Sequence, residues 1–436
     1  MCRWTAFFLF ATLGFSQTTL VKTTRLLDVK SGRYLTDQGI LIRDGDIRQV
    51  GPFDAVRAAA PGDAAVLDLS GLTILPGLID CHAHLLIAAP EKMNGQDALI
   101  LSIAKLSPMK RALLGAQQAK EVLEAGFTTV RNVGHSGVDG DVALRDAIEN
   151  RWVPGPRVFA SARKIVPEGG QAIPVQGAVL ESLLKEEFLT ASNPDEGRRA
   201  VLADLRVGAN WIKAVADDGP RTINLETMKT IVEEAHRGGV RVAVHASSNV
   251  GIQIAVDAGV DSIEHADFAT EPQFRAMQAK GIFLVPTLWP RETMPHWPAL
   301  VGVDAPLRLK SLDGDAYLKR YAEVEQAKMN LARKTGVKIA FGSDEWFERD
   351  AKTRGQATLR VLSAMAEFGM SPAEALRSAT IDAAELLQLQ NVAGSIEPEK
   401  LGDLVGVQGD PLQRLADIQN VKFVMKGGLV VKDWRR

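Results

Sequence analysis

Two histidines stand two positions apart, directly behind an apolar run, in "LPGLIDCHAHLL" (residues 75–86). They are His82 and His84. If the run is a strand, side chains at i and i+2 lie on one face, so both imidazoles can reach the same point. Neutral imidazole nitrogen is a ligand for divalent cations such as zinc. The pair therefore predicts a metal site at the end of this strand.

Three further donor residues follow later apolar runs in the same way. His245 comes at the end of "RVAVH", His265 at the end of "DSIEH" and Asp344 at the end of "FGSD". Taken singly, His245 also fits a hydrogen-bonded core histidine, and Asp344 fits the N-cap of a following segment. Because all three stand in the same place relative to their own strands, we expect them to join His82 and His84 at one edge.

Four imidazoles and one carboxylate exceed what one catalytic ion needs, since three protein ligands and a water suffice. Two ions fit this donor set better, and two close cations require a bridging anion. Lys213 in "GANWIKAVADDG" ends the fourth predicted strand. Burial lowers the pKa of a lysine, and the neutral amine can then react with CO2 to give a carbamate with one oxygen for each ion. The alternative is an ordinary lysine whose stem packs on apolar surface.

Between residues 75 and 391 the chain alternates short apolar runs with longer helical patterns. N-cap and first-turn signals mark helix starts at Ser371–Pro372 and Asn193–Pro194. About eight such units predict an α/β fold of the (β/α)8 type, whose strands bring their C-terminal ends together. The runs that we interpret as strands are "GLTILPGLIDCH", "TTVRNVG", "RVFASA", "NWIKAVA", "RVAVHA", "DSIEHA", "IFLVPT" and "VKIAFGSD".

Residues 18–74 and 392–436 have a different pattern. Stretches such as "GILIRDGDIRQVG" and "VKFVMKGGLVVK" alternate β-formers with turn residues, which predicts short antiparallel strands. Because the two ends of a chain often lie close together, we expect these segments to form one small β-rich domain.

The first 17 residues, "MCRWTAFFLFATLGFSQ", combine an early positive charge, a short apolar stretch and small residues. This arrangement is typical of a secretory signal peptide and is shorter than the roughly 20 residues of a membrane span. We therefore expect export to the periplasm or the extracellular space without a stable membrane span. An uncleaved membrane tether is the alternative. Cleavage would leave Cys81 as the single cysteine, expected to be a small buried residue without a disulfide.

The composition describes an ordinary globular protein. Hydrophobic residues make up 46%, charged residues 24%, and the formal net charge is -2. This balance gives no electrostatic attraction to nucleic acid, so we expect a small-molecule partner. Helices on the outside of the barrel could also pair subunits in a homo-oligomer.

The sequence resembles the amidohydrolase superfamily, and within it the imidazolonepropionase-like and Xaa-Pro-dipeptidase-like members. The resemblance spans nearly the whole of the chain after residue 17. It is carried by "LPGLIDCHAHL", "GFTTVRNVG", "GPRVFAS", "IKAVADDG", "VAVHA", "GVDSIEHA", "FGSD", "GMSPAEALRSAT" and "AGSIEPEKLGDLV".

This resemblance implies a distorted (β/α)8 TIM barrel, residues 75–391, with a flanking β-sandwich built from residues 18–74 and 392–436. It implies that His82, His84 and Asp344 hold one divalent ion, that His245 and His265 hold the other, and that a carboxylated Lys213 bridges them. Zinc is the expected metal. Two positions depart from many relatives, which have Asp where this chain has Asn132 and His where it has Gln171.

The expected activity is metal-dependent hydrolysis of a carbon–nitrogen bond, most simply the amide of a dipeptide or an N-acyl amino acid. A hydroxide bridging the two ions would attack the carbonyl, and Asp344 would act as general base and then as general acid. Lactonase, phosphotriesterase and cyclic-amide hydrolase activities would use the same donors. A deaminase is disfavoured because "ASSNVG" after His245 has no acid, and a non-catalytic scaffold would not need all six donors.

Other residues near predicted strand ends could contact a substrate, although loop or core positions explain them equally well. They are Arg131, His135, Trp289, Arg291 and His296.

Overall fold

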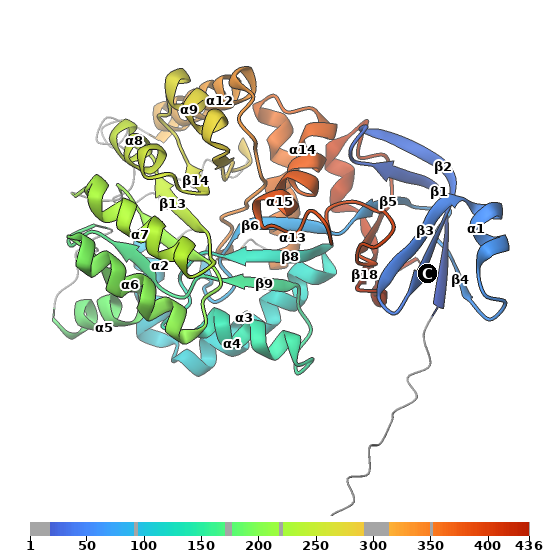
Figure 1. Ribbon diagram of the computed structural model, residues 1–436, viewed down its shortest axis with the longest axis horizontal. Coiled ribbons are helices and arrows are strands. Elements are labelled where there is room, and N and C mark those ends of the chain that lie inside the picture. The colour runs from blue at the N-terminus through green and yellow to red at the C-terminus, as the bar shows by residue number, and fades with distance from the viewer. Residues whose placement is uncertain are drawn as a thin grey trace, which may run out of the picture.

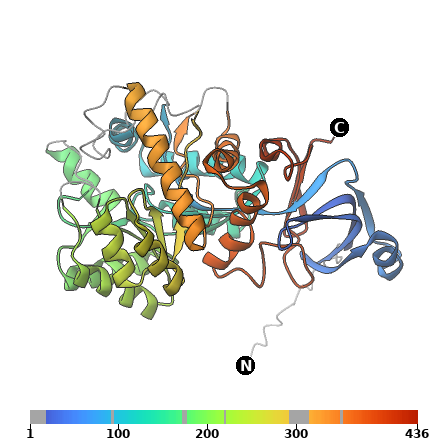
Figure 2. The ribbon, with the colours of Figure 1, turned by 90° about the horizontal axis from the view of Figure 1, so that it is seen from above.

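The computed structural model describes residues 18–90, 95–170, 177–217, 221–291, 314–348 and 352–435 (Figure 1). The predicted signal peptide, residues 1–17, lies outside the described residues. None of the described helices has the length and apolar character needed to span a bilayer. Figures 1 and 2 show a blue and red β-sheet at one end of the molecule and parallel strands with helices around them at the other.

Strands from both ends of the chain share one mixed sheet. The order is β19-β18-β17-β5-β1-β2-β3, and β4 pairs with β1. β5 joins the two parts, because it runs parallel to β1 and antiparallel to β17, with Leu404 opposite Pro76. The bounds are β1 Thr18–Asp28, β2 Arg33–Arg43, β3 Asp46–Pro52, β4 Ala65–Asp68, β5 Thr73–Pro76, β17 Leu404–Val407, β18 Val421–Lys426 and β19 Leu429–Asp433. The hydrogen bonds describe one sheet, and the two-layer sandwich stays a prediction.

The chain passes from this sheet to the parallel strands at a single glycine. Gly77 lies between β5 and β6, and its N–H donates to the Asp403 carbonyl. A Cβ at this position would lie 2.2 Å from Thr128 Oγ1, so only glycine fits. The predicted continuous strand "GLTILPGLIDCH" is therefore two strands, and β5 spans the predicted domain boundary at residues 74 and 75.

The parallel strands form two hydrogen-bonded sheets. One has the order β6-β8-β9 and the other β11-β10-β12-β13-β14-β15, while β7 and β16 form a separate pair. Their bounds are β6 Leu78–Ala83, β7 Ala89–Pro90, β8 Phe127–Asn132, β9 Arg157–Ala160, β10 Lys164–Val166, β11 Phe188–Thr190, β12 Ile212–Val215, β13 Val242–Ala246, β14 Ser262–His265, β15 Phe283–Val285 and β16 Phe347–Glu348. Seven of the runs predicted as strands are thus confirmed to contain one.

Helices alternate with these strands, as an α/β fold requires. They are α1 Phe53–Ala59, α2 Gly95–Lys105, α3 Pro108–Glu124, α4 Gly140–Glu149, α5 Ala178–Glu187, α6 Pro194–Val207, α7 Leu225–Arg237, α8 Asn249–Ala258, α9 Glu271–Lys280, α12 Gly314–Thr335, α13 Arg354–Ala364, α14 Pro372–Ser378 and α15 Ile381–Leu386, with 3-10 turns η2 Met365–Phe368 and η3 Leu415–Gln419. Figure 1 shows α14 and α15 between the two ends of the molecule.

The predicted eighth strand, "VKIAFGSD", is not a regular strand. It makes one isolated bridge, between Leu284 and Ile339. Its later backbone groups form hydrogen bonds with two other elements. Phe341 N–H donates to the Ser378 carbonyl at the end of α14. The Phe341 carbonyl accepts from Cys81 N–H, and Asp344 N–H donates to the His82 carbonyl, both in β6. The segment lies between β15 and β6 without a ladder to either. The α/β fold with parallel strands is confirmed, whereas a continuous closed sheet is not found among the described residues.

Candidate metal centre

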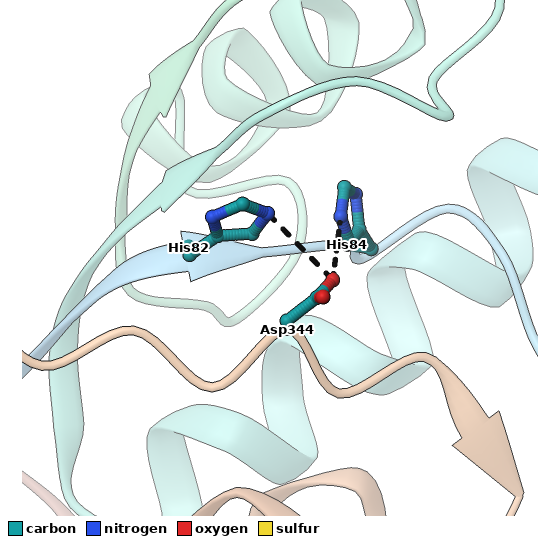
Figure 3. Close-up of side chains that lie close together, drawn as sticks. All are labelled: His82, His84 and Asp344. Atoms are coloured by element: carbon teal, nitrogen blue, oxygen red, sulfur yellow. Dashed lines mark ion pairs between the residues drawn. The ribbon is translucent and has the colours of Figure 1, made fainter. Parts of the chain in front are cut away.

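Three of the predicted ligands meet at the end of β6. His84 Nε2 lies 3.1 Å and His82 Nε2 lies 3.6 Å from the same carboxylate oxygen of Asp344. Figure 3 shows the Asp344 carboxylate pointing toward both imidazoles. In the part of the chain that the structure describes, this is the one group of three or more His, Cys, Asp or Glu residues whose ligand atoms all lie within 4.8 Å of one another. The structure thus brings the imidazoles of His82 and His84 to one carboxylate, as their spacing predicts. That they bind a metal stays a prediction.

The Asp344 segment is held against β6 by a buried carboxylate that sequence reasoning missed. Asp80 accepts hydrogen bonds from the His82 N–H at 3.0 Å and from both the N–H and the hydroxyl of Ser343, at 3.0 and 2.6 Å. Asp344 itself has a positive φ of 49°, which costs energy in a non-glycine residue. Gly342 allows the close approach, because a Cβ there would lie 2.6 Å from the His82 Cβ.

Three of the histidines have the Nδ1 side of the ring occupied by an acceptor. His82 Nδ1 lies 2.7 Å from Glu264 Oε2, His84 Nδ1 lies 3.1 Å from the Gly134 carbonyl, and His265 Nδ1 lies 2.7 Å from Thr287 Oγ1. The Thr287 hydroxyl donates to Pro286, so its oxygen accepts from His265. These partners place the proton on Nδ1 and leave the Nε2 lone pair for a cation. The donor set thus fits a divalent metal.

Glu264 is the second residue that sequence reasoning missed. It is fully buried and accepts from the guanidinium of Arg131 at 2.8 Å as well as from His82. Burial raises the pKa of Glu264, but Arg131 and His82 lower it to about 2, so the group is an anion. A carboxylate behind a ligating imidazole fixes its orientation and increases its basicity. The available signal was a charged residue inside each of two apolar runs, "TTVRN" and "DSIEH".

Arg131 was a candidate for substrate contact, and the structure places it elsewhere. Its guanidinium is buried, donates to the Cys81 carbonyl at 2.5 Å and lies over the Trp211 ring. Because its remaining donors bind Ser262 and Glu264, it is part of the support for His82 and cannot grip a substrate.

His245 and His265 form a second pair beside the first. Their ring centroids lie 4.4 Å apart, and His265 lies 5.2 Å from His82. Burial, followed by the neighbouring His245, holds the pKa of His265 well below its usual value. Burial and then Lys213 lower the pKa of His82 to about 4. Both imidazoles are therefore neutral near pH 7, the form in which nitrogen binds metal.

Lys213 lies in β12, opposite Ala243 of β13 and Lys164 of β10. It occupies the second position of its strand and not the C-terminal end that the sequence predicted. The side chain is buried, and burial lowers the pKa of its amine to about 8. A substantial neutral fraction is thus accessible in mildly alkaline solution, as carboxylation requires.

The sequence pattern of the amidohydrolase family matches residues 73–431. The chain belongs to this family. It is accordingly a hydrolase that acts on carbon–nitrogen bonds.

Particular relatives of this amidohydrolase cover most of its length. An ochratoxinase from Aspergillus niger is 29% identical over 393 residues, which are 82% of this chain and 75% of the relative. An imidazolonepropionase from Pseudomonas fluorescens is 27% identical, covering 90% of this chain and 93% of the relative. The crystal structure of a Xaa-Pro dipeptidase with bound methionine has a TM-score of 0.80 at 30% identity, covering 95% of this chain and 100% of that one.

The other residues of this amidohydrolase that were predicted as possible substrate contacts lie in different places. The His135 ring lies 4.9 Å from His84, and its Nε2 lies 3.2 Å from Lys164 Nζ. Trp289 is buried against Phe347, and Arg291 binds Glu367 on the surface. His296 and Gln171 lie outside the described residues.

Asn132, where many relatives have Asp, has a structural role. Its Oδ1 accepts from Leu85 N–H at 2.8 Å, and its Nδ2 donates to Ser136 and to the buried Asp141. An aspartate could not donate to Asp141. The amide therefore joins β8 to the chain that follows His84 without introducing a charge.

Proposed function

We propose that this amidohydrolase cleaves the amide bond of a dipeptide or an N-acyl amino acid with the help of two divalent ions, zinc being the expected metal. The observation that carries the proposal is the row of four imidazoles, His84, His82, His265 and His245, whose neighbouring rings lie 5.2, 5.2 and 4.4 Å apart, with Asp344 at one end. Neighbouring rings in this row are the ones predicted to share an ion. His82 and His84, with Asp344, would hold one ion, and His265 and His245 would hold the other. A carbamate on Lys213 would bridge the two halves.

Divalent ions bound there would polarise the scissile carbonyl and lower the pKa of a water molecule toward neutrality. The residues of the chain supply the proton transfers. Burial raises the pKa of Asp344, but His82 and His84 lower it below its usual value, so the carboxylate is ionised at neutral pH. It can accept a proton from the attacking water and deliver it to the leaving nitrogen.

The substrate proposal draws on the relatives, one described as a Xaa-Pro dipeptidase and one as an ochratoxinase. We further propose that the two parallel sheets represent a distorted (β/α)8 barrel with the site at the C-terminal ends of its strands. Export by way of residues 1–17 is also part of the proposal.

Replacement of Asp344 tests the catalytic role. Asp344→Asn should reduce kcat on a cleaved dipeptide by about 10²- to 10⁴-fold, because the amide cannot accept the proton. The content of bound zinc should stay near two ions per chain, measured by atomic emission on the purified protein. Asp63→Asn, on an exposed turn, is the control and should leave kcat unchanged. Near-normal turnover of Asp344→Asn on a panel of dipeptides, N-acyl amino acids and lactones would end this assignment.

A further inference from the structure

A lysine far from the ligands in sequence contacts the loops that hold one of them. Lys328 lies inside α12, and its side chain is fully buried. Its ammonium pairs with Glu325 Oε2 at 2.6 Å and with Asp267 Oδ1 at 3.1 Å, and it donates to the Pro286 carbonyl at 3.2 Å. Two of these three partners belong to the segments that follow β14 and β15.

Both segments are in direct contact with His265. Asp267 is two residues after His265 in the chain. Pro286 also accepts from the Thr287 hydroxyl at 2.9 Å, and that hydroxyl oxygen lies 2.7 Å from His265 Nδ1. The ammonium and the imidazole are thus connected through one carbonyl and one hydroxyl. Asp267 additionally hydrogen-bonds the side chain of Ser247, two residues after His245.

The backbone around His265 needs such support. His265, Ala266 and Thr287 have positive φ values of 70°, 54° and 51°. Each non-glycine residue in the left-handed region costs on the order of 1 kcal/mol, and such strain persists only where surrounding contacts impose it. Lys328 binds Asp267 and Pro286, which directly adjoin these strained residues in the segments after β14 and β15.

Stability alone does not explain a lysine at this position. Burying an ammonium is costly, and an apolar residue of similar volume is often neutral or stabilising in place of a buried ion pair. The same helix already contributes the buried apolar side chains Met329 and Ala332 to the core. What an apolar residue could not do is bind Asp267 and the Pro286 carbonyl at once.

We propose that Lys328 is a positioning residue for His265, which fixes the imidazole with its proton on Nδ1 and its Nε2 lone pair available for a cation. The inference rests on the proposed function in one respect, that His265 is a ligand. It acts on the ion held by His265 and His245, whereas the ion held by His82, His84 and Asp344 does not depend on it.

The first measurement uses metal-free protein, so that it is independent of the metal proposal. In ¹⁵N-histidine spectra, wild-type His265 should show a single Nδ1–H tautomer, assigned by its loss in His265→Gln. Lys328→Met should convert it to a tautomer mixture. Lys334→Met is the matched control, because Lys334 lies on the same helix with its side chain 61% exposed, and its spectrum should equal that of the wild type.

The second measurement is a zinc titration followed by calorimetry. Lys328→Met should weaken the binding of one ion by about 10- to 100-fold and leave the other within threefold. An unchanged His265 tautomer together with two unchanged affinities would overturn the inference. A wild-type protein that binds fewer than two ions would instead overturn the binuclear proposal, while the tautomer comparison still decides the role of Lys328.

A second variant covers the case in which Lys328→Met does not fold. Lys328→Met/Asp267→Asn removes the ammonium and the Asp267 charge together. Burial raises the pKa of the other partner, Glu325, to about 8, so that acid stays protonated at neutral pH and no ionised carboxylate is left unpaired. The double variant does not restore the bond to Pro286. It should fold and still show the tautomer mixture. If this variant has wild-type spectra, or if neither variant folds, Lys328 has a purely structural role and the inference is wrong.

Discussion

At the scale of single residues, three imidazoles of the candidate metal centre each have a different kind of acceptor beside Nδ1. His82 has the carboxylate of Glu264, His84 the carbonyl of Gly134, and His265 the hydroxyl of Thr287. A carboxylate polarises an imidazole more strongly than a neutral oxygen does. His82 should therefore be the most basic of these three candidate ligands.

Replacing Glu264 by glutamine tests this difference. Glu264→Gln removes the negative charge behind His82 and leaves the buried Arg131 without its ion-pair partner. Metal affinity should fall about 10- to 100-fold, and the free energy of unfolding should fall by about 3–5 kcal/mol. Zinc titration and urea unfolding of the metal-free protein measure the two effects.

Glu271→Gln is the control for that variant. Glu271 pairs with Arg275 and Lys334 on the surface, where ion pairs contribute little, so its loss should leave both the free energy of unfolding and the zinc affinity nearly unchanged. Equal zinc affinity in Glu264→Gln and the wild type would show that the carboxylate contributes nothing to the site.

At the scale of elements, the least regular segment of the parallel region carries Asp344. The predicted strand "VKIAFGSD" makes a single bridge, because Phe341 binds α14 and β6 while Asp344 binds His82. At Gly342 the segment packs closely against both β15 and β6. An added Cβ would lie 2.4 Å from Val285 Cγ1 and 2.6 Å from His82 Cβ.

Gly342→Ala should therefore move His82 and Asp344 apart. We expect a loss of about 1–3 kcal/mol in the free energy of unfolding, from overpacking, and a fall in kcat larger than the fall in the folded fraction. Urea unfolding and turnover at saturating substrate measure the two quantities. Gly62→Ala, where an added Cβ meets no atom within 4 Å, should change neither. A fully active Gly342→Ala would show that the close approach is dispensable.

The same segment shows what sequence could and could not predict. Alternating apolar runs located β6, β8, β9 and β12 to β15, and the capping signals at Ser371 and Asn193 mark the starts of α14 and α6. The approach of His82 and His84 to one point could be predicted because their spacing in the sequence is local. Glu264, Asp80 and Lys328 were not, because each acts through partners between 42 and 263 positions away in the sequence. Nothing local distinguishes the irregular segment 337–344 from a strand, since its hydrogen bonds are decided by α14 and β6.

At the scale of the whole molecule, one buried acid makes the stability depend on pH. Asp204 of α6 is buried, and its ion-pair partner is the Arg163 guanidinium, whose Nε lies 3.7 Å from Asp204 Oδ1. Burial raises the pKa of Asp204 from 3.8 to about 8. The folded protein thus keeps a proton that the unfolded chain has released, and stability from this group falls as the pH rises from about 4 to about 8.

Asp204→Asn should remove that loss. The variant and the wild type should be equally stable near pH 4, and the variant should be more stable by about 1–3 kcal/mol at pH 8. Urea unfolding at several pH values, in the presence of a chelator, measures the difference. Asp195→Asn lies in the same helix with its side chain 77% exposed and should show no such pH-dependent gain. A pH-independent difference for Asp204→Asn would mean that the carboxyl is ionised in the folded state.

The position of β5 between β1 and β17 also determines when the site can be completed during synthesis. The polypeptide leaves the ribosome from its N-terminus, so His82 and His84 emerge more than 300 residues before Leu404–Val407. Until β17 has been synthesised, β5 lacks one of its two neighbours, so the strand that follows Gly77 and carries the first candidate ligands is not held at its N-terminal end. The nascent chain therefore carries the candidate ligands His82 and His84 for most of translation before it can hold them in place.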